Sequence, residues 1–319
     1  MNNSVLVLTL AGAVATSTPV VLAALGELLA ERSGVLNLGV EGMMLVGAVA
    51  GIGVVNTWTA SWPVGLVAAA VAGMMLASVH AFVCVTLGLS QIVSGLALVV
   101  LGAGISSFVA DIGSSPLDGQ PAAARIPSLT IPWLENVPVV GPIVFDQDPV
   151  VYASWGLASL IAFYLRSSRF GLRLRAVGDS PATADSVGVS VASYRWVHVL
   201  AGGALAGMGG AYVSLSLTPA WTDGLTVGQG WIAIAIVIFA GWRAVPVLVG
   251  AYLFGVLGRL GFALQAAQIE AVPPELLAMI PFVVAVVLLV LLSGPRMRRR
   301  RGAPLALAVA FERGSSYQE

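Results

Sequence analysis

Long uncharged apolar runs recur along this chain of 319 residues. A membrane-spanning helix needs roughly 20 apolar residues to cross a hydrocarbon core about 30 Å thick. The second run is interrupted by Glu41, and the seventh is short enough to be re-entrant or tilted. We expect about nine crossings, within a range of eight to ten, in an all-α polytopic membrane protein. The predicted crossings are residues 5–27, 34–55, 63–87, 90–110, 149–166, 195–217, 229–241, 244–265 and 277–294.

The composition supports a membrane environment and excludes several kinds of chemistry. Charged residues make up 9% of the chain and apolar residues 58%, whereas soluble domains carry about 25% charged residues. All 15 basic residues are arginine. A nucleotide-binding P-loop requires a lysine on the phosphates, so the chain has no P-loop of its own. Cys84, His80 and His198 are isolated in apolar stretches, which predicts no disulfide, metal site or resident cofactor.

The distribution of arginine predicts the orientation, because cytoplasmic loops of membrane proteins are enriched in basic residues. Arginines cluster around the loop at 167–194 and again after the last crossing, so both regions are predicted to be cytoplasmic. The loop at 111–148 is acidic and is predicted to be extracytoplasmic. The number of crossings then places the N-terminus outside. We expect a transmembrane domain at 1–295 and an Arg-rich cytoplasmic tail at 296–319, with no nucleic-acid-binding pattern.

Two stretches resemble each other weakly. Leu36–Gly42 (LNLGVEG) and Leu225–Gly230 (LTVGQG) each precede an apolar run, and the predicted topology has the chain enter the membrane from opposite sides at the two stretches. This pattern is typical of an inverted repeat, which in transporters places the substrate site between the repeats.

Glu41 is an ionisable residue close to hydrocarbon, which is rare and indicates a cavity or a partner. Asn37 and Glu41 are four residues apart and are predicted to share a helix face. They either line a solute pathway or form a structural hydrogen-bond cluster with Arg32 or a backbone amide, and the sequence leaves both interpretations open. The small residues from Gly203 to Gly210 predict close helix packing.

The cytoplasmic loop contains a short helix signal. Asp179 or Ser180 can cap a helix, and Pro181 suits its first turn. Gly188 is placed to end it after about two turns. We therefore predict a helix at 181–187 on the cytoplasmic face.

This loop resembles the coupling segment of permeases in the family of ATP-binding-cassette importers for ribose-type sugars, nucleosides and branched-chain amino acids. Those proteins share the pattern Arg-Ala-Val-Gly-(Asp/Glu)-x-Pro-x-Ala-Ala-x-x-x-Gly, and residues 175–188 match it except that Thr183 replaces an alanine. Residues 31–44, 228–233 and 241–242 are most similar to the nucleoside branch. The resemblance extends from about residue 20 to 294.

The resemblance implies a multi-pass permease of the bacterial inner membrane that is not itself an enzyme. Its implied partners are cytoplasmic ATPase subunits, a second permease subunit that we expect to be a different chain, and an extracytoplasmic substrate-binding lipoprotein. The implied coupling residues, which would transmit the motion of the ATPase, are Gly178, Asp179, Pro181, Ala182, Ala184 and Gly188.

The resemblance also implies a substrate, most closely a nucleoside, with a ribose-type sugar or a branched-chain amino acid as the alternatives. For a nucleoside, Trp231 would stack on the base or else anchor the chain at the membrane interface. The other residues assigned to the pathway would bond hydroxyls: Asn37, Glu41, Thr226 and Gln229. An ATP-independent secondary transporter is the competing class, because such proteins also contain inverted repeats and intramembrane carboxylates.

Overall fold

The computed structural model describes residues 3–112, 117, 119–135, 137–266, 273–292 and 302–311. Within these residues, six helices are long and apolar enough to cross a membrane. The protein is therefore an all-α polytopic membrane protein, as predicted. The six candidate spans are Leu6–Arg32, Val40–Thr57, Trp62–Thr86, Gln91–Asp111, Pro149–Ser167 and Val191–Leu217.

A helix lies at each of the nine predicted crossings. These are α1 (Asn3–Arg32), α2 (Val40–Thr57), α3 (Trp62–Ala81), α4 (Gln91–Asp111), α5 (Pro149–Ser167), α8 (Val191–Tyr212), α9 (Gln229–Phe239), α10 (Ala244–Ala266) and α11 (Pro274–Leu292). The sequence did not predict the helix α6 (Arg169–Asp179), which precedes the short helix α7 (Pro181–Ser186).

Several short elements complete the described chain. Three π-helical turns are η1 (Phe82–Thr86), η2 (Gly141–Phe145) and η3 (Val213–Leu217). Strands β1 (Leu129–Thr130) and β2 (Asp146–Gln147) pair antiparallel, with Leu129 opposite Gln147. Both strands belong to the predicted extracytoplasmic loop.

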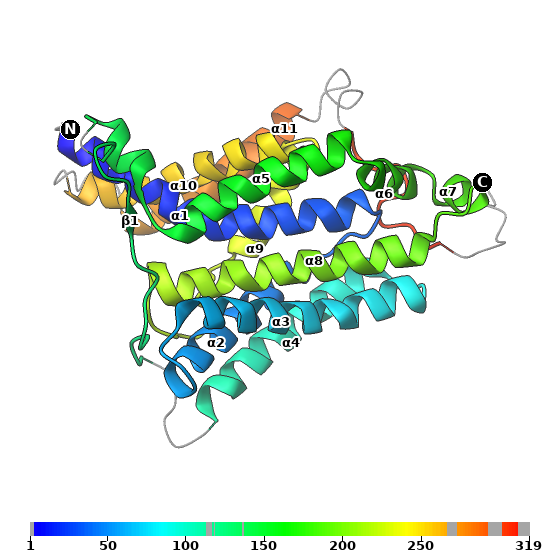
Figure 1. Ribbon diagram of the computed structural model, residues 1–319, viewed down its shortest axis with the longest axis horizontal. Coiled ribbons are helices and arrows are strands. Elements are labelled where there is room, and N and C mark those ends of the chain that lie inside the picture. Colours follow the sequence, from blue (N-terminus) through cyan, green and yellow to red (C-terminus); the bar gives the residue numbers. More distant parts are fainter. Residues whose placement is uncertain are drawn as a thin grey trace.

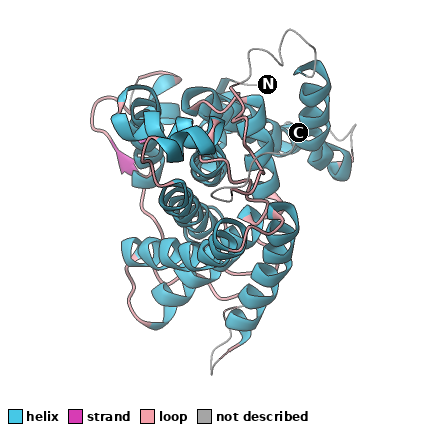
Figure 2. Cartoon of the chain, turned by 90° about the vertical axis from the view of Figure 1, so that its right-hand side faces the viewer, coloured by secondary structure: helices cyan, strands magenta, loops and turns pink. Residues whose placement is uncertain are grey.

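The molecule has two distinct ends (Figure 1). Helices α6 and α7 lie at one end, which we call the α7 end, and β1 and the start of α1 lie at the other. Figure 2 looks onto the α7 end and shows several helices nearly end-on. The loops at 111–148 and 167–194 are thus at opposite ends, as the arginine distribution predicts.

Helix α8 packs closely against α1, α2 and α3 because glycines remove side chains from its surface. A Cβ atom added to Gly210 would lie 1.8 Å from the carbonyl oxygen of Met44 on α2. One added to Gly207 would lie 2.2 Å from that of Ala69 on α3. Backbones this close require glycine, so the predicted small-residue face is confirmed.

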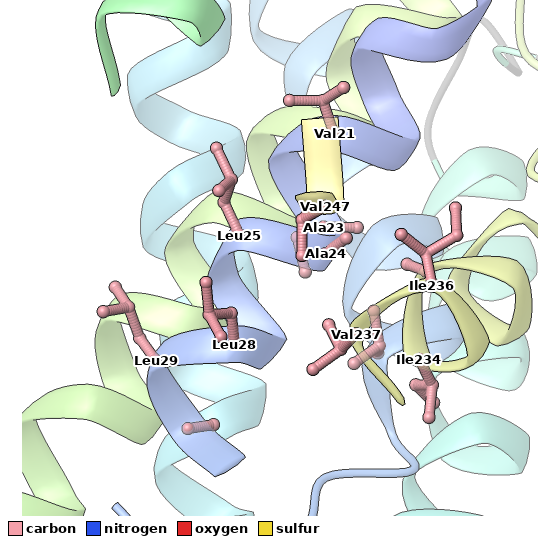
Figure 3. Close-up of a cluster of buried hydrophobic side chains, with 14 of the residues drawn as sticks. Val21, Ala23, Ala24, Leu25, Leu28, Leu29, Ile234, Ile236, Val237 and Val247 are labelled. Atoms are coloured by element: carbon pink, nitrogen blue, oxygen red, sulfur yellow. The ribbon is translucent and has the colours of Figure 1, made fainter. Parts of the chain in front are cut away.

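The largest apolar cluster joins helices that are distant in sequence (Figure 3). Six residues of α1 pack with Ile234, Ile236 and Val237 of α9 and with Val247 of α10. They are Val21, Ala23, Ala24, Leu25, Leu28 and Leu29. This packing holds the short helix α9 inside the bundle.

Candidate functional site

The chain between α1 and α2 is not helical, although it is buried in the helix bundle. Gly34 has a left-handed φ of +91°, a conformation that suits glycine. Helix α2 begins only at Val40. The predicted crossing at 34–55 therefore starts too early, and Asn37 does not share a helix face with Glu41.

Side chains form hydrogen bonds with the backbone groups that this break leaves without helical partners. The Leu36 N–H donates to Gln91 Oε1 at 2.7 Å, and the Asn37 N–H donates to Glu27 Oε1 at 2.9 Å. His80 Nε2 lies 3.1 Å from the Leu36 carbonyl oxygen. Irregular backbone is tolerated at membrane depth only when its polar groups find such partners. The sequence did not predict the roles of Gln91 and His80.

A second break precedes α9, and the Glu41 side chain forms hydrogen bonds with residues of this break. Gly228 is left-handed, with a φ of +80°. The Glu41 carboxylate accepts hydrogen bonds from Thr226 Oγ1 at 2.5 Å, the Gly228 N–H at 2.9 Å and the Gly230 N–H at 2.7 Å. A carboxylate at a helix N-terminus is favoured by the helix dipole and satisfies otherwise unpaired amides. The hydrogen-bond partners of Glu41 are Thr226 and two backbone amides, not Arg32.

The two similar stretches therefore meet in space. Residues 36–42 lead into α2 and residues 225–230 lead into α9, and the Glu41 cluster (Glu41, Thr226, Gly228 and Gly230) joins them. A Cβ atom on Gly230 would lie 2.6 Å from the Glu41 backbone nitrogen. The beginnings of both helices are thus in direct contact.

The five predicted pathway residues have different environments. Asn37, Glu41 and Thr226 are 1%, 7% and 0% exposed and are held by hydrogen bonds. Trp231 is 38% exposed. Gln229 lines a cavity of about 200 Å³.

This cavity, which we call the Gln229 cavity, lies between α1, α9, α10 and α11. Its polar wall consists of Thr16, Gln229 and Arg259, and its other walls are apolar or glycine. Gln229 Oε1 is buried and has no hydrogen-bond partner among the described residues. The Arg259 guanidinium lies over Gly12, where a Cβ atom would be 2.0 Å from Nη2. A charged side chain facing an intramembrane cavity is typical of a solute pathway.

A hydrogen-bonded group joins the end of α1 to the turn before α10. Trp242 Nε1 donates to the Glu31 carboxylate. Arg32 Nε and Nη2 donate to the Trp242 carbonyl oxygen at 2.9 and 2.6 Å. These contacts fix the position of the α9–α10 turn at the α7 end.

The predicted loop helix is confirmed as α7. The hydrogen bonds Gly188 N–H to Asp185 O at 2.9 Å and Val189 N–H to Ala184 O at 3.0 Å close its C-terminus, and Gly188 has a φ of +82°. This geometry is a Schellman ending, which requires the left-handed residue to be glycine or similar.

The residues assigned to coupling fall into two groups. Asp179, Ala182 and Gly188 are exposed, whereas Pro181 and Ala184 face the protein. Gly178 is also buried, and a Cβ atom there would lie 2.3 Å from the Arg32 carbonyl oxygen. Gly178 therefore positions α6 against α1 and is not part of the exposed surface.

A segment after the last helix packs on this region. The Ala306 N–H donates to the Gly178 carbonyl oxygen at 2.9 Å, and the Ala308 N–H donates to that of Gly34 at 3.2 Å. Arg195 Nη1 donates to the Val309 carbonyl oxygen at 3.0 Å. The sequence gave no function for residues 303–319, and of the predicted tail the residues 296–301 and 312–319 lie outside the described part.

These features define a class of protein: a membrane protein in which two helix breaks meet, with a cavity next to the second break and a short helix exposed at one end. No group of three or more potential metal ligands occurs among the described residues. A model of the family described as "Branched-chain amino acid transport system / permease component" matches residues 9–292. The chain belongs to this family. It is thus a multi-pass inner-membrane component of a transport system.

Several curated proteins are similar over most of their length. A putative glucose ABC transporter permease protein of Haloferax volcanii is 42% identical over 83% of this chain and 80% of its own. A nucleoside ABC transporter permease protein of Lactococcus lactis is 32% identical over 87% of this chain and 90% of its own. A guanosine ABC transporter permease protein of Bacillus subtilis is 31% identical over 93% of this chain and 94% of its own. No solved structure matches the chain.

Proposed function

We propose that the chain is the permease subunit of an ATP-driven importer and forms a translocation pathway for nucleosides. The observation that carries this proposal is the meeting of two broken helices beside the Gln229 cavity, in a chain of a permease family. Two relatives named as nucleoside or guanosine permeases, each covered over most of its length, support the substrate.

The pathway would use the broken helices as follows. The buried Asn37, Glu41 and Thr226 hold the two breaks together, and Gln229 and Arg259 present polar groups to the solute. A nucleobase edge offers an N–H next to an acceptor, which suits the Gln229 carbonyl oxygen and the Arg259 guanidinium. The apolar remainder of the cavity suits a flat ring and rapid release. Trp231 is exposed and would contact lipid or the second permease.

The proposed orientation follows the arginine distribution. The α7 end would be cytoplasmic, so that the N-terminus and residues 111–148 lie outside and residues 167–194 and 296–319 lie inside. Nine helices would enter the membrane within the domain at 1–295, with α2 and α9 beginning inside it.

The chain itself would hydrolyse no ATP, since it lacks lysine and hence a P-loop. Separate cytoplasmic ATPases would bind α7 and the residues that flank it, through the exposed Asp179, Ala182 and Gly188. A second permease that is a different chain and an extracytoplasmic binding lipoprotein would complete the importer. The chain would carry no cofactor of its own.

The test is purification and reconstitution of the complex that assembles around a tagged copy of this chain. We expect an ATPase, a second permease and a lipoprotein to co-purify, and ATP-dependent uptake of guanosine or uridine into proteoliposomes. Gln229→Leu should lower this uptake, whereas Gln120→Leu, at a half-buried glutamine of the loop at 111–148 that does not line the Gln229 cavity, should not. Uptake without any ATPase would instead support a secondary transporter.

A sugar is the second candidate substrate. The putative glucose permease of Haloferax volcanii shares 42% identity with this chain. Labelled glucose and ribose, and leucine as a branched-chain amino acid, belong in the same uptake assay. Uptake of glucose with no uptake of guanosine or uridine would show that the nucleoside proposal is wrong while leaving the importer proposal intact.

A further inference from the structure

A second cavity lies at the α7 end and is lined by four arginines. It has a volume of about 320 Å³ and is bounded by Arg32, Arg166, Arg175, Arg243 and Trp242, with an apolar side formed by residues of α5 and α10. We call it the arginine cavity. Its lining residues include no aspartate or glutamate. Four like charges around one cavity repel one another, so the arrangement favours a bound anion.

The four arginines come from parts of the chain that are far apart in sequence. Arg32 ends α1, Arg166 lies in the last turn of α5, Arg175 lies on α6, and Arg243 directly precedes α10. A topology signal requires only that arginines be near the cytoplasmic face. It does not require four separate elements to direct them at one cavity, and packing of α5 against both α6 and α10 brings them together.

The arginines are available to a ligand to different degrees. Arg32 is fixed by its hydrogen bonds to the carbonyl oxygens of Trp242 and Gly302. Arg175 Nε is buried and has no hydrogen-bond partner among the described residues. Arg166 and Arg243 are exposed. The cavity thus has a positive wall held by hydrogen bonds and two exposed guanidiniums. Guanidiniums bind phosphate oxygens in a bidentate manner.

The surface next to the cavity is apolar. Phe163 and Leu160 on α5 are exposed, as are Val245 and Val249 on α10. These two helices lie side by side in Figure 1 and are in contact. An anion that bound here with hydrocarbon attached could place its charge among the arginines and its chains along α5 and α10.

We propose that the arginine cavity binds the phosphate of an anionic phospholipid. Phosphodiester headgroups lie at the depth where a transmembrane helix ends, and basic pockets between helices on the cytoplasmic side suit them. This inference depends on the proposed orientation of the α7 end but not on the substrate. The bound lipid would tie the end of α1 to α6, the element that leads directly into α7.

The experiment compares lipids on the purified complex in detergent. Phosphatidylglycerol should bind to the wild-type complex and raise its apparent Tm, because a ligand of the folded state stabilises it. Phosphatidylcholine, which has a phosphate but no net charge, should not. Inorganic phosphate and glycerol phosphate form the third arm and should not raise the Tm either. Native mass spectrometry of the same samples counts the retained lipid.

A matched pair of variants locates the site. The double variant Arg166→Gln/Arg243→Gln removes two exposed charges from the cavity mouth and should weaken phosphatidylglycerol binding by about tenfold or more. The control Arg169→Gln/Arg173→Gln removes two exposed charges from α6 that do not line the cavity. It should bind phosphatidylglycerol like the wild type. Both variants should have the wild-type Tm in phosphatidylcholine, which shows that they are folded.

Three results would overturn the proposal. Equal weakening in both double variants would mean general attraction of anionic lipid to a basic surface. Stabilisation by inorganic phosphate alone would make the cavity a site for a free anion. No difference between phosphatidylglycerol and phosphatidylcholine in the wild type would mean that no anionic lipid site exists. None of these results bears on whether the complex transports nucleosides, because the readout does not include uptake.

Discussion

At the scale of single residues, Glu41 links the two halves of the chain. Its carboxylate is only 7% exposed and accepts hydrogen bonds from Thr226, Gly228 and Gly230. A buried carboxylate is costly unless its oxygens are bonded, and amides at the start of a helix inside a bilayer have no water to bond. The carboxylate of Glu41 therefore gives the amides at the start of α9 an acceptor, and these amides give the buried carboxylate its donors.

Replacing Glu41 with glutamine should destabilise the protein substantially. The amide would present an N–H₂ group to backbone N–H donors, and hydrogen bonds to a charged acceptor contribute about 1.5–3 kcal/mol each. We expect a loss of roughly 2–4 kcal/mol, measured as a lower apparent Tm of the purified complex. The control is Asp111→Asn, an exposed carboxylate at the end of α4. Equal Tm values for the two variants would contradict a structural role for Glu41.

Sequence patterns identified Glu41 as unusual but could not decide its role. A carboxylate near hydrocarbon indicates a partner without naming it, because the partners here are backbone amides 187 and 189 residues away. The same reason explains why Gln91 and His80 were missed. Their partner is the backbone of Leu36, and no sequence pattern identifies a side chain that bonds a distant main chain.

At the scale of elements, α8 depends on glycine for its contacts with three neighbours. Gly207 and Gly210 bring its backbone against α3 and α2. Helices in a bilayer gain little from burying apolar surface against one another, so they associate through such close packing.

The change Gly210→Ala should therefore separate α8 from α2. Its Cβ atom would lie 1.8 Å from the Met44 carbonyl oxygen, which is backbone and cannot move aside without moving α2. Overpacking of this kind costs about 1–3 kcal/mol, so less folded protein should be recovered by detergent size-exclusion chromatography. The control is Gly156→Ala in α5, where a Cβ atom would meet nothing within 4 Å. A wild-type yield of folded Gly210→Ala protein would show that the close contact between Gly210 and Met44 is not required for folding.

Helix α7 offers the corresponding test of coupling. Ala182 is exposed on α7, so Ala182→Arg should leave the fold and Tm unchanged. A bulky charge on a surface that binds an ATPase should lower ATP-driven uptake by about tenfold or more, while ATP hydrolysis continues. A tenfold effect corresponds to a loss of about 1.4 kcal/mol of interaction free energy. Ala123→Arg at the opposite end, also exposed, is the control. Normal uptake by the Ala182→Arg complex would remove α7 from the proposed ATPase contact.

The elements were predicted more completely than their boundaries. Apolar runs located nine helices of the described chain, six of which are long and apolar enough to cross a membrane, and capping signals located α7. The start of α2 was placed too early because hydropathy does not detect that Gly34 and Gly39 end one helix and begin the next. Helix α6 was missed because its arginines lower its hydropathy, although every third or fourth residue from Gly171 is buried.

At the scale of the whole molecule, the C-terminal segment 302–311 joins parts of the α7 end that the chain does not connect locally. It bonds Arg32 at the end of α1, Gly34 in the first break, Gly178 at the end of α6 and Arg195 at the start of α8. Phe311 packs into the small apolar cluster of Val177, Ala184 and Val191 beneath α7. Sequence alone could not show this, because the segment has no helix period and all its partners are distant.

Deleting residues 302–319 should consequently loosen α7 from the membrane helices. The carbonyl oxygens of Gly34 and Gly178 and the guanidinium of Arg195 would lose their partners in this segment, and each lost bond contributes about 0.5–1.5 kcal/mol. We expect a lower Tm and less nucleoside transported for each ATP hydrolysed, because a loosely held α7 transmits less motion. Deletion of residues 312–319 alone keeps Phe311 and every bond named here, so it should match the wild type. If both deletions transport equally well per ATP, the segment stabilises the α7 end without taking part in coupling.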